Sequence, residues 1–311
     1  MEREYILEII ANTTDICLRV ETAAAIGKFD GIHIGHRRLL EEILSRKKDG
    51  LAACVFTFDP PPACFFGSSD GKELTMKAEK RLLFERMGVD ILIEFPLNKE
   101  TAATPPEAFA RDILAGQMKA RFVAAGTDLS FGAGGAGNAE LLRRLGPELG
   151  FGFQTIDKVC LDREEVSSTL VRAKVEKGEM EEACKLLGMP YLIAGEVVSG
   201  NHIGRRIGFP TINILPEKNK LLPPNGVYFS SVRAGGKNYR AITNVGYKPT
   251  VAHEKVMGVE SYLYDFEGDL YGEQAEVYLS SFHRPEKRFE SVEALGDQLR
   301  LDIAAGAAVV P

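Results

Sequence analysis

The hydrophobic pattern of this chain changes at residues 188–190, and that change constrains the fold more than any other feature. Before it, short apolar runs alternate with stretches in which apolar residues recur at helical spacing. After it, apolar and polar residues alternate over short segments separated by turns. The change predicts two domains of different class, and a length of 311 residues favours the same number. We place them at residues 1–184 and 185–311.

The first domain is predicted to be a doubly wound parallel α/β sheet, because strand and helix patterns alternate along it. The strand patterns cover residues 18–26, 51–58, 90–95, 121–125 and 151–159, and the helix patterns cover residues 37–47, 77–87, 105–117 and 138–149. For the helix at 105–117 we expect Thr104 as cap and Pro105 as first residue. Ligands of such sheets bind at the carboxyl ends of strands, so the loops after Ile26, Phe58 and Ala125 are the expected site.

The second domain is predicted to be an antiparallel barrel or sandwich that ends in a helix. Its short strand patterns cover residues 191–198, 226–233, 239–245, 259–264 and 275–279. The helix pattern covers residues 291–304 and carries Val292, Leu295, Leu299 and Ile303 on one face.

Composition excludes several classes of protein. The net charge is −6, which argues against a surface that coats nucleic acid. No apolar run is long enough to span a bilayer, and the first residues lack the pattern of a signal peptide. The five cysteines are scattered without CxxC spacing, which favours reduced thiols in a cytoplasmic protein. We expect a monomer or weak homo-oligomer that binds neither membranes nor nucleic acid.

A compact motif at residues 23–36 predicts a phosphate site. An apolar run is followed by a turn that contains Gly31, and then by His33, Gly35 and His36 at the start of a helical pattern. Helix N-termini attract anions, glycine lets the backbone approach a ligand, and imidazole N–H groups donate to phosphate oxygens. The alternatives are a glycine turn with two surface histidines, or a zinc pair. Zinc is the weaker idea, since no nearby Cys or His cluster supplies the other ligands.

Three further segments have both a functional and a plain interpretation. Residues 126–138 are rich in glycine and by themselves favour a flexible loop. In residues 166–172, Ser168 and Thr169 are ordinary helix caps or, with Arg172, contacts for a nucleotide triphosphate. Residues 199–213 are basic and punctuated by glycine, yet they lack the Gly-Lys-Ser/Thr of a Walker loop, so a hairpin loop is an equal alternative.

The first half resembles a known family at two motifs. Residues 27–36 read Gly-Lys-Phe-Asp-Gly-Ile-His-Ile-Gly-His, which resembles the His-x-Gly-His signature of Rossmann-like nucleotidylyltransferases and, in Gly-x-Phe-Asp-Gly, the branch that adenylates FMN. Residues 166–172 resemble that superfamily's second signature, Ile-Ser-Ser-Thr-x-Ile-Arg. The resemblance implies catalytic His33 and His36, and ATP or phosphate contacts from Gly27, Phe29, Asp30, Gly35, Ser168, Thr169 and Arg172.

The glycine-rich segment resembles the family's Gly-x-Asp/Asn-Phe-x-Phe-Gly segment, which implies a flavin or nucleotide contact from Asp128. Two residues depart from the pattern. Leu129 stands where Phe is usual, and Gly135 stands in a glycine run where relatives often carry Arg or Lys.

The second half resembles the riboflavin kinase signature Gly-Arg-x-x-Gly-Phe-Pro-Thr-x-Asn at residues 204–213. That resemblance implies a base at Glu260, phosphate contacts from Gly204 and Gly208, and Mg²⁺ ligands from Thr211 and Asn213. It also implies flavin contacts from Asn244 and Arg284.

Together the two halves resemble the bacterial bifunctional riboflavin kinase/FAD synthetase family over nearly the full chain. The resemblance implies ATP and Mg²⁺ as co-substrate and cofactor, and riboflavin, FMN and FAD as substrates or products. Three alternatives remain at this point: nucleotidyl transfer to another phosphorylated acceptor, a riboflavin kinase with an impaired adenylyltransferase domain, and a non-catalytic flavin- or nucleotide-binding protein.

Overall fold

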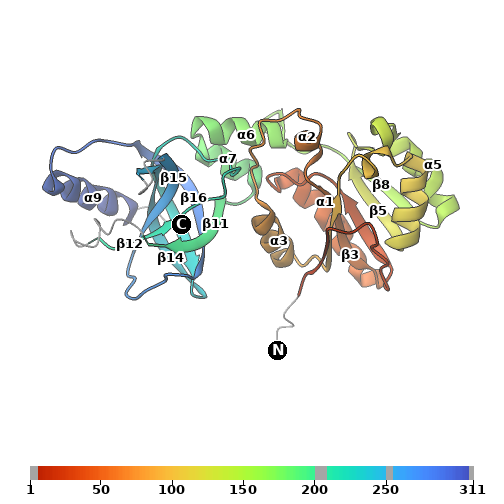
Figure 1. The fold of residues 1–311 in the computed structure, drawn as a ribbon, viewed down its shortest axis with the longest axis horizontal. Helices are drawn as coiled ribbons and strands as arrows, with labels where there is room; N and C mark the ends of the chain where they lie inside the picture. The colour runs from red at the N-terminus through yellow and green to blue at the C-terminus, as the bar shows by residue number, and fades with distance from the viewer. Residues whose placement is uncertain (1–5, 200–208, 250–254, 308–311) are drawn as a thin grey trace. The chain divides into compact units, whose positions relative to one another are not determined.

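The structure is a computed structural model that describes residues 6–199, 209–249 and 255–307 (Figure 1). The chain forms two compact units. The first comprises Met1–Lys72 and Lys80–Ser167, and the second comprises Glu73–Glu79 and Ser168–Pro311. No helix among the described residues is both long and apolar enough to cross a membrane.

The first unit contains a parallel sheet, as predicted, but the sheet has six strands rather than the five expected. In spatial order its strands are β1 (Glu8–Ala11), β4 (Ile91–Pro96), β3 (Ala52–Asp59), β2 (Thr22–Ile26), β5 (Ala120–Gly126) and β8 (Gly152–Ile156). Every residue of β2 is buried, as expected for a central strand covered on both faces. From β2 the chain builds β3 and β4 on one side, and β5 and β8 on the other. The switch point of the sheet therefore lies between β2 and β5, where a ligand site is expected.

The other elements of the first unit surround this sheet. The helices are α1 (Ile34–Ser45), α2 (Pro62–Phe65), most of α3 (Lys77–Arg86), α4 (Pro106–Ala108), the π-helix η3 (Phe109–Gln117) and α5 (Ala139–Leu149). The short elements are η1 (Arg46–Asp49), η2 (Thr101–Ala103), η4 (Ala133–Gly135), β6 (Ser130–Phe131), β7 (Gly137–Asn138), β9 (Cys160–Leu161) and β10 (Glu164–Glu165). Helix α1 packs on β2 and β5, and α5 packs on β8.

The predicted start of the helix at residues 105–117 is wrong by one residue. Pro105 is the N-cap and Pro106 is the first helical residue, while Thr104 ends the preceding turn η2. Pro106 fits the first helical position because its ring sets φ and that position needs no N–H donor. From Phe109 onward the helix is π-helical, which the sequence pattern did not predict.

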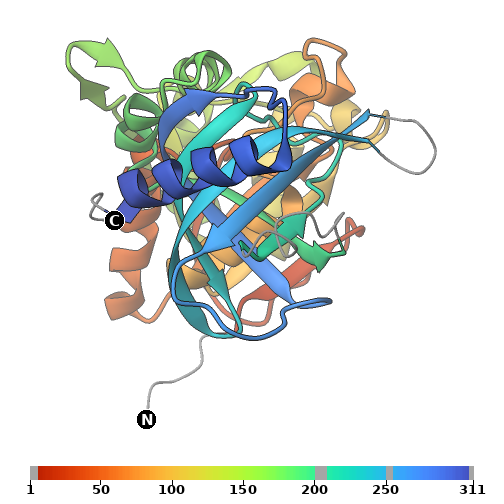
Figure 2. The same cartoon turned by 90° about the vertical axis from the view of Figure 1, so that its left-hand side faces the viewer.

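The second unit contains a closed antiparallel barrel, which confirms the barrel among the two predicted forms. Its strands, in spatial order, are β11 (Tyr191–Val198), β12 (Thr211–Ile214), β15 (Lys255–Leu263), β14 (Lys237–Pro249), β13 (Gly226–Ala234) and β16 (Gln274–Pro285). Helices α6 (Ser168–Lys177) and α7 (Met180–Leu187) precede the barrel, and α9 (Val292–Ala307) follows it. Helix α9 lies across the barrel strands and contacts β14 (Figure 2).

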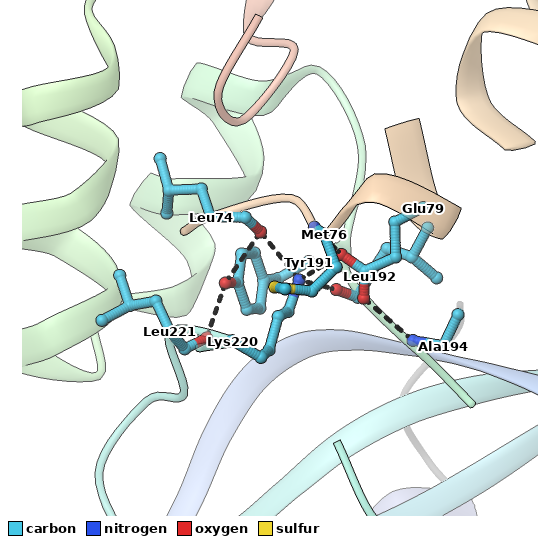
Figure 3. A network of polar contacts seen from close by, with 8 residues as sticks. All are labelled: Leu74, Met76, Glu79, Tyr191, Leu192, Ala194, Lys220 and Leu221. Atoms are coloured by element: carbon cyan, nitrogen blue, oxygen red, sulfur yellow. Dashed lines mark hydrogen bonds and ion pairs between the residues drawn. The ribbon is translucent and has the colours of Figure 1, made fainter. Parts of the chain in front are cut away.

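A fully buried ion pair joins the segment Glu73–Glu79 to the barrel within the second unit (Figure 3). Lys220 Nζ donates to Glu79 Oε2 at 2.6 Å, to the Leu74 carbonyl at 2.7 Å and to the Leu192 carbonyl at 2.6 Å. An ammonium group has three N–H donors, and here each one has an acceptor. The backbone N–H of Ala194 donates to the second oxygen of Glu79 at 3.0 Å. This satisfied network fixes the segment against β11.

We expect Lys220→Met to lower the free energy of unfolding by about 3–5 kcal/mol, because the variant leaves the Glu79 carboxylate buried without its cation. The double variant Lys220→Met/Glu79→Gln removes the charge and keeps an acceptor for Ala194, so it should recover at least half of the loss. The chain has no Trp, so urea unfolding is followed by circular dichroism. A double variant as unstable as the single one would contradict this account.

Candidate active sites

The loop between β2 and α1 is held in one conformation by buried side chains. Phe29 and Ile32 have positive φ values of 50° and 41°, and Gly31 has a φ of 88°. Such conformations are costly for residues other than glycine and persist only where the surroundings impose them. Both side chains are completely buried, so packing provides that constraint. The loop is thus a rigid feature at the carboxyl end of the central strand.

The two histidines lie together at the start of α1. His33 is the N-cap, and its Nδ1 accepts a hydrogen bond from the backbone N–H of His36 at 3.3 Å. Their rings stack with centroids 3.8 Å apart. A side chain at Gly35 would place its Cβ 3.1 Å from His33 Nδ1, so glycine leaves room for this ring. The predicted pair of imidazoles at a helix N-terminus is confirmed.

The hydrogen bonding of these rings indicates how they would meet a ligand. Because His33 Nδ1 is an acceptor, the neutral ring carries its proton on Nε2, which is left to donate. His36 Nδ1 is buried and has no hydrogen-bond partner within the described part of the chain. A buried polar atom without a partner requires an explanation, and contact with a ligand supplies one.

Both histidines are neutral at pH 7. Burial lowers the pKa of His33 to about 4, although the Asp128 carboxylate acts in the opposite direction. Burial also lowers the pKa of His36 well below its ordinary value, and the charges of His33 and Lys80 lower it further. These rings therefore offer hydrogen-bond donors to an anion rather than positive charge.

The low pKa of His33 predicts a loss of stability in acid. The unfolded chain takes up a proton near pH 6.5, whereas folded His33 resists protonation until about pH 4. The free energy of unfolding is therefore not reduced by this group above pH 6.5, and it falls by about 3 kcal/mol as the pH falls toward 4. We expect His33→Asn, which retains a helix cap, to reduce the pH dependence of urea unfolding by that amount. If the free energy of unfolding of the variant and of the parent protein depended equally on pH, the low pKa assigned to His33 would be refuted.

The remaining predicted residues of the first half lie around this loop. A side chain at Gly27 would put its Cβ 3.0 Å from the Phe29 ring, which itself lies 5.1 Å from the His36 ring. Asp30 is half-buried in the same loop. Asp128 is exposed after β5, across the switch point, where its charge acts on His33. The structure thus brings together the residues predicted from two of the loops.

The structure explains why the glycine-rich segment departs from the family pattern at Gly135. Strands β6 and β7 pair across it, and Gly135 has a φ of 68°. A Cβ at Gly135 would lie 2.5 Å from Ser130 Oγ, whose hydroxyl donates to the Gly135 carbonyl. This turn therefore favours glycine over Arg or Lys. Leu129, the other departure, packs against the core of the sheet.

The second predicted phosphate motif lies at the start of α6. Ser168 and Thr169 are the first two residues of that helix, and Arg172 follows one turn later. When the chain is divided into its two compact units, these residues fall in the second unit, whereas the histidines fall in the first. Their convergence on one nucleotide stays a prediction.

In the barrel, strand register places four of the predicted residues in one row. Asn213 pairs with Glu260, Glu260 with Asn244, Asn244 with Val227, and Val227 with Arg284. Residues paired across antiparallel strands point to the same face of a sheet. Residues from five neighbouring strands are therefore collected on one face.

The prediction of a loop at residues 199–213 is wrong for its last part, because Thr211 and Asn213 lie on β12.

Glu260 lies between Asn213 and Asn244 in that row and has a direct hydrogen-bond partner. Thr211 Oγ1 donates to Glu260 Oε1 at 2.6 Å. Both side chains line a cavity of about 560 Å³, together with Asn244 and Arg284. Leu295, Leu299 and Ile303 of α9 line the same cavity, so the apolar face predicted for this helix forms a wall of it. Val292, the fourth residue of that face, is 53% exposed.

A second, smaller pocket of about 70 Å³ adjoins the first. Thr211 lines both pockets, and Asn213 lines the smaller one. Hydroxyl and amide oxygens are hard ligands that suit Mg²⁺, so this pair fits the predicted ion. In the described ranges, no group of three or more His, Cys, Asp or Glu residues could hold a metal ion. Gly204 and Gly208 lie outside the described residues.

Two residues at this site were missed from the sequence. Glu286 accepts from Asn244 Nδ2 at 3.4 Å, and Asp302 accepts two hydrogen bonds from Arg284. Asp302 interrupts the apolar stripe of α9 next to Ile303, and a carboxylate in that position could have been recognised in the sequence. Glu286 stands in a charged stretch after β16 and carries no such signal.

The fold and both sites define a two-domain transferase that uses nucleotides. A parallel sheet carries the loop with the two stacked histidines at its switch point, and a closed barrel carries an acidic residue at the wall of a ligand-sized cavity. Family models agree: FAD synthetase matches residues 18–170, and riboflavin kinase matches residues 187–310.

Known proteins resemble the chain over almost its whole length. A bifunctional riboflavin kinase/FMN adenylyltransferase of Listeria monocytogenes is 34% identical over 295 residues, which cover 93% of each chain. The protein of that name from Escherichia coli K12 is 36% identical over 280 residues, which cover 89% of each chain. The chain belongs to the bifunctional riboflavin kinase/FMN adenylyltransferase family. A crystal structure described as a macrolide-efflux protein from Streptococcus pneumoniae is similar with a TM-score of 0.84, at 31% identity, over 98% of this chain and 100% of the other.

Proposed function

We propose that this chain phosphorylates riboflavin with ATP to give FMN, and then adenylates FMN with ATP to give FAD and pyrophosphate. The barrel carries the first reaction and the parallel sheet the second. The observation that supports this most strongly is the hydrogen bond from Thr211 to Glu260, a member of the cross-strand row, at the wall of a cavity large enough for a flavin ring. Family models for both activities match the two corresponding halves.

In the barrel, Glu260 is the proposed general base. The riboflavin 5′-hydroxyl must lose its proton as it attacks the γ-phosphate of ATP, and a carboxylate at the cavity wall can accept it. The hydrogen bond from Thr211 orients the carboxylate. Asn244 and Arg284 line the same cavity and are the proposed flavin contacts.

Thr211 and Asn213 are the proposed Mg²⁺ ligands. Bound there with the nucleotide, Mg²⁺ would neutralise charge on the transferred phosphate. We assign the phosphate-binding role of the preceding segment to Gly204 and Gly208, on the resemblance alone.

Adenylyl transfer needs no strong base, because the FMN phosphate is already an anion. Catalysis there depends on positioning and on stabilising charge at the α-phosphate. His33 and His36 donate from the start of α1, where the helix also attracts anions. Gly27, Phe29, Asp30 and Gly35 shape that loop, and Asp128 is the proposed flavin or nucleotide contact. Ser168, Thr169 and Arg172 are proposed as triphosphate contacts on the resemblance alone.

We retain residues 1–184 and 185–311 as the proposed functional modules. We also propose a cytoplasmic location, since all five cysteines are free thiols and two of them, Cys17 and Cys160, are exposed. A monomer or weak homo-oligomer remains the expected state.

The acceptor of the adenylyl group is tested by separate assays with different acceptors. The protein is supplied with ATP and either FMN or another phosphorylated acceptor, such as nicotinamide mononucleotide or phosphopantetheine. We expect an adenylylated product only from FMN. Transfer to another acceptor with FMN inactive would overturn the assignment of the first half, and binding of both ligands without product would favour a non-catalytic protein.

A further inference from the structure

Helix α9 is attached to the barrel by a buried carboxylate. The Asp302 side chain is only 1% exposed. Arg284 donates to both of its oxygens, from Nε at 2.9 Å and from Nη2 at 2.6 Å. Gln298 Nε2 donates at 2.9 Å, and His283 Nε2 lies 3.3 Å away. A buried charge is costly unless it is paired in this way.

The pairing keeps Asp302 ionised. Burial by itself would raise the pKa of this carboxyl group, but the hydrogen bonds from Arg284 and Gln298 and the charge of Arg284 lower it overall. A two-point contact between a planar guanidinium and a carboxylate also fixes orientation. Because Arg284 lies on β16, this contact sets the position and rotation of α9 relative to the barrel.

The same helix supplies the apolar wall of the Glu260 cavity. Asp302 is adjacent to Ile303 and one turn from Leu299, and both residues line that cavity. The end of the helix has separate attachments: Tyr264 OH donates to the Ile303 carbonyl at 2.6 Å, and Arg240 Nη1 donates to the Ala307 carbonyl at 3.1 Å. Loss of the Asp302 contact should therefore shift the wall without releasing the whole helix.

We propose that Asp302 is a positioning residue for riboflavin phosphorylation, which holds the α9 wall of the cavity in place through Arg284. This inference rests on the proposed function of the barrel. Asp302 acts on the surface that receives the apolar flavin ring, whereas Glu260 acts on the hydroxyl that reacts. Removal of the Asp302 carboxylate should therefore weaken riboflavin binding much more than it lowers the rate at which bound riboflavin is phosphorylated.

The test compares Asp302→Asn with Asp297→Asn, a matched change at an exposed ion pair on the same helix. We expect Asp302→Asn to raise KM for riboflavin about 10-fold and to change kcat by less than about 3-fold. Asp297→Asn should leave both values unchanged, and adenylation of supplied FMN should be normal in both variants. A fall in kcat with unchanged KM, or equal loss of both activities, would overturn the proposal.

Two additions keep the test decisive. If Asp302→Asn does not fold, Gln298→Leu removes one donor and keeps the ion pair, and we expect a KM increase of about 2–3-fold. Quenching of riboflavin fluorescence gives a dissociation constant that does not depend on turnover. If the parent protein binds riboflavin without phosphorylating it, the proposed function fails. The positioning role is then upheld by weaker binding in the variant and refuted by equal binding.

Discussion

Glu260→Gln should abolish most FMN formation and leave adenylation of supplied FMN intact. Glutamine has nearly the same shape and still accepts the hydrogen bond from Thr211, but it cannot take the proton of the riboflavin hydroxyl. General bases typically contribute 10²–10⁴-fold, so we expect kcat for riboflavin phosphorylation to fall by about 10³-fold. Chromatographic assays with riboflavin and with FMN measure the two activities separately.

Glu196→Gln is the matched control for this change. Glu196 is exposed on β11 of the same barrel, so its loss of charge should leave both activities unchanged. A Glu260→Gln variant that retained most of its riboflavin phosphorylation would show that another group accepts the proton.

His36→Ala should have the opposite effect to Glu260→Gln: it should lower FAD formation and leave FMN formation intact. The variant removes a ring whose buried Nδ1 has no partner in the described structure, and it also removes the ring stacked on His33. Loss of one preorganised donor at a developing charge typically lowers the rate 10²–10³-fold, and we expect FAD formation to fall by about that factor. FMN formation from riboflavin should stay within about twofold of the parent, because the barrel has its own site.

Arg38→Ala tests whether any change on α1 has this effect. Arg38 is exposed and forms a surface ion pair with Glu41. This variant should keep both activities. If His36→Ala reduced FMN and FAD formation equally, the assignment of the two reactions to separate sites would be wrong.

The sequence predicted the elements whose signal is local. Strand β2 is a continuous apolar run because it is buried on both faces, and the loop after it carries the glycines that its backbone requires. Strand β1 was missed because it is an edge strand of only four residues, none of them buried, and its apolar run, residues 9–11, is too short to stand out. Strand β12 was missed because it follows a glycine-punctuated segment that resembles a loop.

The sites were only partly predictable, for a different reason. Motifs identified Glu260, Thr211 and the two histidines, but the row that joins Asn213, Glu260 and Asn244 depends on strand register, which no single strand encodes. The low pKa values of the two histidines likewise depend on burial in the folded chain and, for His36, on the charge of Lys80, which lies far away in the sequence.

One measurement tests the central claim most directly: a chromatographic time course of the parent protein with riboflavin, ATP and Mg²⁺. We predict that FMN appears first and then converts to FAD. FMN that accumulates without FAD would contradict the second activity and direct attention to the turn at Gly135. Absence of any product, from riboflavin or from added FMN, would contradict the account as a whole.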